Sequence, residues 1–271
     1  MCCNKKVGTM LKTENIYYQV GKKQILKDIS TVFYPGQVTV ILGPNGSGKS
    51  SFLKIACGET NDFTGNVFYD SRNSKDFQKK ELAKNRAVMS QQTELNFPLL
   101  VSEVVMMGRY PHFAFNPGSR DMAICEEIMS LMDLNAFKDR NYLTLSGGEK
   151  QRVQFARVLT QIWDAPSNGN RYLFLDEPIA SLDIHYQHQF LQTTKMLAAE
   201  NIAVIAVLHD INLAMQYGDE VIFMKEGAIV KKGDPADTIT AELIHEVFNI
   251  PVKIVGFDAA EKPVIVYQHL H

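Results

Sequence analysis

The chain has 271 residues and a formal net charge of −2, and 45% of its residues are hydrophobic. This length is enough to bury a substantial core in one domain that carries an inserted subdomain. The balanced charge gives no electrostatic reason to expect a nucleic-acid partner. Apolar runs such as residues 202–208 are far shorter than the roughly 20 residues of a membrane-spanning helix, so we expect no such span.

The cysteines bear on the compartment. Cys2, Cys3, Cys57 and Cys125 show neither a disulfide framework nor paired metal-ligand spacing, which favours a reducing, cytoplasmic environment. The start MCCNKKVG allows two interpretations, a lipid-anchored segment or a flexible terminus. No apolar signal segment precedes the cysteines, so we favour the flexible terminus.

The first elements in chain order are a β-hairpin, with its turn at residues 21–23 and its second arm at 24–29, then a short strand and a helix. Ile16, Tyr18 and Val20 alternate with polar neighbours, which predicts a strand with one buried face. A short apolar run at residues 38–42 leads into a glycine-rich loop. Residues 50–57 then show helical character, so this part of the chain predicts a strand, a loop and a helix.

Further along, three apolar runs at residues 172–175, 202–208 and 220–224 are typical of strands buried on both faces. Helical segments between them indicate a parallel α/β sheet. The strand signal disappears at about residues 96–165, where five side chains recur at helical spacing and predict a helix core: Met122, Cys125, Ile128, Met129 and Met132. We therefore expect one domain, residues 1–271, with a core at about 9–95 and 166–271 and a helical subdomain at about 96–165.

One glycine-rich segment matches the phosphate-loop pattern G-x-x-x-x-G-K-[ST]. It consists of Gly43, Pro44, Asn45, Gly46, Ser47, Gly48, Lys49 and Ser50, with Ser51 next in the helix. The pattern lies between an expected strand and an expected helix, as the motif requires. Backbone N–H groups of such a loop and helix start face phosphate oxygens. We expect Lys49 to reach the β- and γ-phosphates of ATP and the Ser50 hydroxyl to ligate Mg²⁺.

Two carboxylates end the expected strand at residues 172–175. Asp176 and Glu177 lie at the edge where α/β sheets present their ligand sites. We expect Asp176 to bind in the Mg²⁺ shell and Glu177 to polarise the attacking water. A solvated acidic strand end is the alternative interpretation, which the phosphate loop makes less favourable.

A second helix start has the features of an anion site. Leu145 precedes Ser146, Gly147, Gly148 and Glu149, and an apolar helical pattern follows. Exposed amides at such a start bind anions. Two phosphate-binding helix starts for one nucleotide are explained if two copies of the chain sandwich it, whereas a helix cap with glycines is the alternative for the pentapeptide alone.

Together, GPNGSGKS, LSGGE and LFLDEP resemble the nucleotide-binding subunit of an ATP-binding-cassette (ABC) transporter, and the resemblance covers nearly the whole chain. Gln91 in VMSQQ, Asp183 in SLD and His209 in VLHD follow the family order. The resemblance implies a P-loop NTPase (RecA-like) fold: an α/β core with a parallel sheet, an N-terminal antiparallel β subdomain and an inserted α-helical subdomain. It also implies ATP and Mg²⁺ as cofactors.

The resemblance further implies a head-to-tail homodimer with two ATP molecules at its interface. Each ATP lies between one phosphate loop and the LSGGE segment of the other copy. Gln91 contacts Mg²⁺ and relays the nucleotide state, Asp183 bridges the subunits, and His209 holds the γ-phosphate. The implied partners are two transmembrane permease subunits and a substrate-binding protein that acts through them. The implied location is the cytoplasmic face of the bacterial inner membrane.

Two departures from the family pattern stand out. The family often places an aromatic residue before the first hairpin to stack on adenine, but this chain has Val20, and Tyr18 is our candidate in its place. Family members commonly read EPTSALD, whereas this chain reads EPIASLD, with Ile179 and Ala180. The first departure affects which residue contacts adenine, and the second affects the side chains of the loop that contains Ile179 and Ala180.

Within the family, the segments MGRYPH, VQFARVLTQIW and SLDIHYQHQ resemble importers of iron chelates, haem and vitamin B12, with haem importers closest. The expected function is therefore the ATP-hydrolysing motor of a haem importer, with ferric siderophore or cobalamin as alternative cargo. A soluble ABC ATPase of translation or DNA repair is a further alternative. His185 and His188 could ligate a metal, but without a third ligand of suitable spacing we expect a polar helix face.

Overall fold

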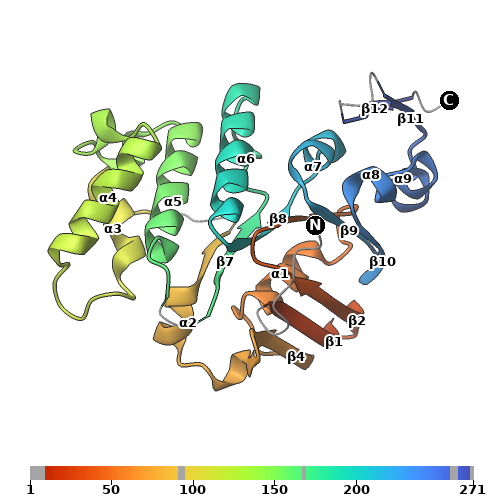
Figure 1. The fold of residues 1–271 in the computed structure, drawn as a ribbon, viewed down its shortest axis with the longest axis horizontal. Helices are drawn as coiled ribbons and strands as arrows, with labels where there is room; N and C mark the ends of the chain where they lie inside the picture. The colour runs from red at the N-terminus through yellow and green to blue at the C-terminus, as the bar shows by residue number, and fades with distance from the viewer. Residues whose placement is uncertain (1–9, 91–94, 167–168, 257–261, 269–271) are drawn as a thin grey trace, which may run out of the picture.

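The computed structural model describes residues 10–90, 95–166, 169–256 and 262–268. Gln91, Cys2 and Cys3 lie outside the described residues. In Figure 1 the inserted helices lie at the left, the strands of the core run through the middle, and the C-terminal elements lie at the upper right.

The central sheet has six strands in the order β10-β9-β3-β8-β7-β6. Neighbours pair in parallel except β9 and β10, which form an antiparallel hairpin. Every residue of β3 and β8 is buried, as expected for strands covered on both faces. The parallel sheet predicted from the apolar runs is therefore confirmed. The strands are β3 (Val38–Leu42), β6 (Arg86–Met89), β7 (Arg171–Asp176), β8 (Ile202–Val207), β9 (Glu220–Lys225) and β10 (Ala228–Gly233).

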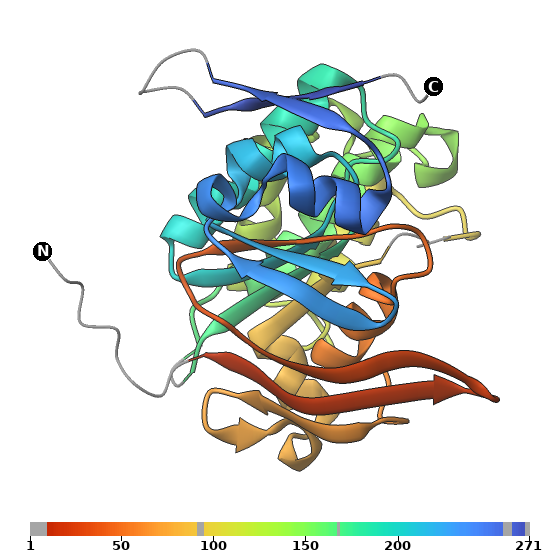
Figure 2. The ribbon, with the colours of Figure 1, turned by 90° about the vertical axis from the view of Figure 1, so that its right-hand side faces the viewer.

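A second, antiparallel sheet packs against the core, below it in Figure 2. Its order is β2-β1-β4-β5, and Val20 pairs with Lys23 across the first hairpin turn. Side chains such as Leu26, Phe33 and Phe52 share one buried cluster with β7 and β8, so α1 lies between the two sheets. The elements are β1 (Leu11–Val20), β2 (Lys23–Phe33), β4 (Thr64–Tyr69), β5 (Arg72–Asn73) and α1 (Lys49–Ala56).

The other face of the central sheet is covered by helices. Leu173 and Leu175 of β7 belong to a larger buried cluster on this face, while Tyr172 and Phe174 belong to the cluster around α1 on the other face. This alternation explains why the strand sequence is apolar throughout. The covering helices include α5 (Gly147–Ile162), α6 (Ile184–Ala199) and α7 (Ile211–Tyr217).

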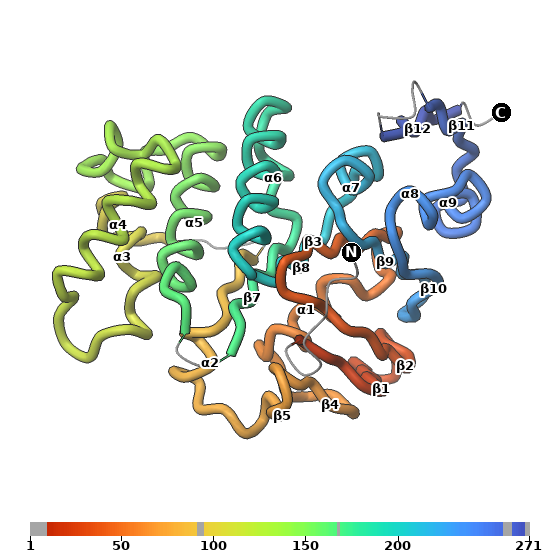
Figure 3. The backbone as a smooth tube through the Cα atoms, in the orientation of Figure 1, coloured from red at the N-terminus to blue at the C-terminus, as the bar shows by residue number. Residues whose placement is uncertain are grey.

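The segment between β6 and β7 is helical (Figure 3). Of the five side chains predicted as its core, Cys125, Ile128, Met129 and Met132 are buried, but Met122 is 52% exposed. The prediction for Met122 was wrong, because it lies in the first turn of α4 on the face turned to solvent. The helices are α2 (Lys79–Asn85) before β6, then α3 (Val101–Met106) and α4 (Ser119–Leu131), with short 3₁₀ turns η1 (Ser74–Asp76), η2 (Met107–Arg109), η3 (Asn135–Phe137) and η4 (Tyr142–Thr144).

One buried cation fastens this helical region. Arg109 is 2% exposed and its Nε lies 2.9 Å from Asp121 Oδ1. Its Nη1 donates to Thr160 O at 2.7 Å, and its Nη2 lies 2.6 Å from Asp164 Oδ2. η2, α4 and the end of α5 are therefore joined through one guanidinium whose donors are largely satisfied.

The chain ends in helices α8 (Pro235–Thr238) and α9 (Ala241–Phe248) and a hairpin of β11 (Val252–Val255) and β12 (Val264–Tyr267). Asn212 of α7 holds the hairpin, because its side chain accepts from Ile265 N at 2.7 Å and donates to Ile265 O at 3.1 Å. Among the described helices, none is long and apolar enough to cross a bilayer.

Candidate nucleotide-binding site

The phosphate loop leaves β3 and turns directly into α1. Gly43 begins the turn, and a Cβ there would lie 2.2 Å from Met224 O, so only glycine fits. Ser47 is buried, and its Oγ has no hydrogen-bond partner among the described residues. A buried hydroxyl of this kind needs an acceptor. A phosphate oxygen in the loop would supply one.

Lys49 lies folded over this loop. Its Nζ donates to Gly43 O at 2.8 Å and to Pro44 O at 3.1 Å, and the residue is only 5% exposed. Burial lowers the pKa of the Lys49 ammonium, while the carboxylates of Glu177 and Asp176 oppose that effect. The loop thus holds a partly desolvated cation that would interact strongly with phosphate oxygens.

Ser50 and Asp176 meet across the site from different elements. Ser50 Oγ, at the start of α1, donates to Asp176 Oδ1 at 3.0 Å, at the end of β7. Burial raises the pKa of Asp176, and the hydrogen bond from Ser50 partly counters that effect. A hydroxyl and a carboxylate oxygen side by side are hard oxygen donors of the kind Mg²⁺ prefers, so these two residues fit the ion.

Glu177 and His209 form a second contact beside this pair. They follow β7 and β8, which are neighbours in the sheet, and His209 Nε2 lies 2.6 Å from Glu177 Oε1. Glu177 has a positive φ of 51° and its N–H donates to Val207 O at 3.2 Å. The backbone at Glu177 therefore has a left-handed conformation that a non-glycine residue seldom adopts.

Residues of the phosphate loop and Glu177 line one open cavity of about 340 Å³. The antiparallel sheet contributes Lys23 and Ile25 to its wall, which the sequence patterns did not single out. The full lining comprises Lys23, Ile25, Asn45, Gly46, Gly48, Lys49, Ser50, Ser51 and Glu177. Phosphate-loop residues and the acidic strand end are therefore brought together, as the sequence predicts.

Tyr18 lies elsewhere. It lines a different cavity of about 300 Å³, together with Asp62, Phe63 and others, and it packs against the buried cluster around α1. The structure does not bring Tyr18 to the cavity that Lys49 lines. Its role as the adenine-stacking residue stays a prediction.

The LSGGE segment begins α5. Ser146 is the N-cap, since its Oγ accepts from Glu149 N at 3.3 Å and Glu149 Oε2 accepts from Ser146 N at 2.7 Å. This reciprocal pair is a capping box. Around Gly147 a Cβ would meet nothing within 4 Å, and Gly148 is nearly as open. None of these residues lines the cavity of Lys49 in the same chain, so the open helix start is available to another molecule.

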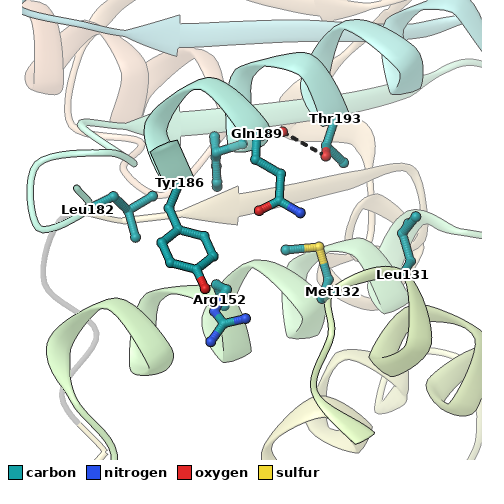
Figure 4. A pocket seen from close by; sticks show the side chains of 8 residues that line it. Leu131, Met132, Arg152, Leu182, Tyr186, Gln189 and Thr193 are labelled. Carbon is teal, nitrogen blue, oxygen red and sulfur yellow. Dashed lines mark hydrogen bonds between the residues drawn. The ribbon is translucent and has the colours of Figure 1, made fainter. Parts of the chain in front are cut away.

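Asp183 caps the neighbouring helix α6, because its Oδ1 accepts from Tyr186 N at 3.0 Å. The close view in Figure 4 shows how α6 meets α5: Tyr186 and Arg152 approach one another across a small pocket. The Arg152 guanidinium carbon lies 4.8 Å from the centre of the Tyr186 ring, a cation–π distance. The contact links the helix capped by Ser146 to the helix capped by Asp183.

The two histidines of α6 each contact a tyrosine. His188 Nδ1 lies 2.8 Å from the hydroxyl of Tyr217 in α7, and the ring of His185 packs edge-on against Tyr186. Among the described residues, no group of three or more His, Cys, Asp or Glu could hold a metal ion.

Comparisons with known proteins agree with this geometry. The family model described as ABC transporter matches residues 26–180. The hemin import ATP-binding protein HmuV of Gloeobacter violaceus is 40% identical over 257 residues, or 95% of this chain and 94% of that protein. A metal-chelate type ABC transporter in an inward-facing conformation superposes with a TM-score of 0.81 at 21% identity, covering 97% of this chain and 98% of that chain. The dimeric structure of MJ0796, a bacterial ABC transporter cassette, superposes with a TM-score of 0.72 at 28% identity, covering 83% of this chain and 99% of that chain. The chain belongs to the ABC transporter family.

Proposed function

We propose that the chain is the ATP-hydrolysing motor of an importer that carries haem across the inner membrane. The observation that carries the ATPase part is the cavity in which Lys49, Ser50 and Glu177 converge, with Asp176 hydrogen-bonded to Ser50. The name of the relative from Gloeobacter violaceus, a hemin import ATP-binding protein, supports haem as the cargo.

The residues in and beside the cavity have separate tasks in hydrolysis. The loop amides, Lys49 and the Ser47 hydroxyl hold the phosphates by charge-assisted hydrogen bonds. Ser50 and Asp176 would hold Mg²⁺, which would supply positive charge to offset that of the phosphates. Glu177 accepts a hydrogen bond from the attacking water and aligns it, and His209 steadies that carboxylate across the 2.6 Å contact.

The motor works as a head-to-tail homodimer. Ser146, Gly147 and Gly148 lie at a helix start with open space around both glycines, and none of them lines the cavity of its own chain. They complete the phosphate site of a second copy, with Glu149 fixing the cap and Asp183 bridging the subunits. The dimeric structure of the related cassette MJ0796 supports this arrangement.

Two permease subunits and a substrate-binding protein complete the importer. The chain acts peripherally, at the cytoplasmic face of the membrane, and Gln91 relays the nucleotide state to the permease. No membrane-crossing helix is found among the described residues, which accords with a peripheral role.

The cargo is tested with the reconstituted importer in proteoliposomes, together with its permease and binding protein. Haem should stimulate ATP hydrolysis, whereas ferric siderophores and cobalamin should leave it at the basal rate. Stimulation by cobalamin alone, or by a siderophore alone, would overturn the cargo while leaving the motor function intact. If none of these cargoes changes the rate of ATP hydrolysis by the complex, an ABC ATPase without a transport role would be favoured.

A further inference from the structure

The loop at residues 178–182, between Glu177 and the start of α6, is held by side-chain amides from two helices. Gln187 of α6 donates from Nε2 to Ile179 O at 3.3 Å and to Leu182 O at 3.0 Å. Carbonyl groups of a loop have few backbone donors within reach, and side-chain amides are a common substitute. The shape of the loop that follows Glu177 therefore depends on these amides.

Gln151 reaches the same loop from a different helix. It lies in the second turn of α5, and its Nε2 donates to Pro178 O. Pro178 is buried, and no backbone N–H of the described residues donates to its oxygen. Since buried carbonyl groups are normally paired, Gln151 supplies a bond that the backbone does not provide.

The position of Gln151 also carries a penalty. Its Oε1 is buried and has no hydrogen-bond partner within the described part of the chain. An unsatisfied buried acceptor is destabilising, and an apolar side chain of similar length would fill the same space without that penalty. The amide at position 151 is therefore best explained by its bond to Pro178 O.

That bond acts next to the carboxylate that aligns the attacking water. Glu177 has a left-handed φ of 51°, and a residue that precedes proline favours extended conformations instead. A backbone of this kind persists only where its surroundings hold it. Val207 O holds the Glu177 N–H on one side at 3.2 Å, and Gln151 holds Pro178 on the other.

We propose that Gln151 is a positioning residue for ATP hydrolysis: its bond to Pro178 O keeps the strained backbone of Glu177, and hence its carboxylate, aimed at the attacking water. The inference rests on the proposed motor function. Gln151 does not line the nucleotide cavity, so it acts through Glu177 and not on ATP itself. Because a displacement of about 1 Å can cost about 10² in rate, losing this bond affects turnover far more than ATP binding.

The test compares Gln151→Met with the matched control Gln154→Met. Gln154 lies one turn further along α5, donates to Tyr142 Oη at 2.8 Å, and likewise has a buried Oε1 without a partner among the described residues. Its bond leads to η4, however, and not to the loop after Glu177. Both variants should lower the Tm to a similar extent. In the reconstituted complex only Gln151→Met should lower kcat, by about tenfold or more, with KM for ATP within about twofold of wild type.

A double-mutant cycle separates positioning from a purely structural role. If Gln151 acts through Glu177, then Gln151→Met should cause no further loss of single-turnover hydrolysis in a Glu177→Gln background. Gln151→Met alone should still double its mass with ATP in light scattering, because nucleotide binding and dimer closure do not use this bond. Additive losses of rate in the cycle would overturn the positioning role.

Gln151→Glu provides a second variant of nearly the same shape. Its ionised carboxylate has no proton to donate to Pro178 O, so it should lose kcat as Gln151→Met does. Wild-type kcat in both variants of Gln151, or an equal loss of kcat in Gln154→Met, would refute the inference while leaving the motor function intact. Near-normal turnover by Glu177→Gln would instead refute the hydrolytic role of Glu177 on which the inference rests.

Discussion

Replacing Arg109 by methionine should destabilise the protein strongly. The change keeps an unbranched side chain but removes the hydrogen bonds that Arg109 donates to the Asp121 carboxylate, in a residue only 8% exposed, and to Thr160 O. Breaking a buried ion pair from one side costs about 3–5 kcal/mol. At about 2 °C per kcal/mol for a chain of this size, we expect the Tm to fall by about 6–10 °C.

The matched control is Arg120→Met. Arg120 pairs with the same Asp164 at 3.0 Å, but its side chain is 69% exposed, so its loss should lower the Tm by about 2 °C or less. Differential scanning calorimetry at pH 7 compares the two variants. Equal losses, or a loss of less than about 2 °C for Arg109→Met, would refute the reasoning.

The loss of stability in Arg109→Met should depend on pH. Burial alone would raise the pKa of Asp121, but hydrogen bonds from Gly118 N and Arg109 outweigh it, so the pKa lies below its ordinary value. Stabilisation from a depressed carboxyl pKa is complete above the ordinary value, about 3.9, and is lost as the pH falls through the folded value. The fall in Tm caused by Arg109→Met should therefore be smaller at about pH 3 than at pH 7.

The remaining predictions concern the nucleotide site. Lys49→Ala should weaken ATP binding measured by calorimetry, and unchanged affinity would count against the phosphate-loop assignment. Gly43→Ala should lower both stability and ATP binding, since its Cβ would lie 2.2 Å from Met224 O. Gly147→Ala has open space and should keep the wild-type Tm while reducing ATP-driven dimerisation in light scattering. His209→Ala should retain ATP binding but reduce turnover by about tenfold or more, which steady-state phosphate release measures.

Much of the central sheet and the phosphate loop could be predicted because their signals are local. The apolar runs before Asp176 and His209 correspond to strands covered on both faces, and the glycine pattern fixes one loop conformation. Because these strands are parallel, their carboxyl ends meet at one edge of the sheet. The contact between Glu177 and His209 follows from that shared edge and from the pairing of β7 with β8.

Other features depend on contacts between distant segments. Arg109 is a charged residue in a largely apolar and aromatic stretch, and its burial depends on Asp121, Thr160 and Asp164 together. Nothing in the local sequence of α4 shows which of its faces the neighbouring helices cover, so the exposure of Met122 could not be predicted.

The residue that contacts adenine could not be predicted from the sequence for a similar reason. The pairing of β1 with β2 shifts between Tyr18 and Gln19, so strict alternation cannot be carried from Val20 back to Tyr18. Lys23, paired with Val20, lines the nucleotide cavity instead. A register shift of this kind leaves no distinct mark in the sequence.

The most direct test of the account is Glu177→Gln, assayed for steady-state ATP hydrolysis and for mass by light scattering with and without ATP. The amide keeps the shape of the side chain but removes the carboxylate that aligns water. We expect turnover to fall by about 10²–10⁴ while ATP still binds and doubles the mass, as an ATP-stabilised dimer requires. Near-normal turnover, or an unchanged mass with ATP, would contradict a motor whose hydrolysis depends on Glu177 and on dimer closure.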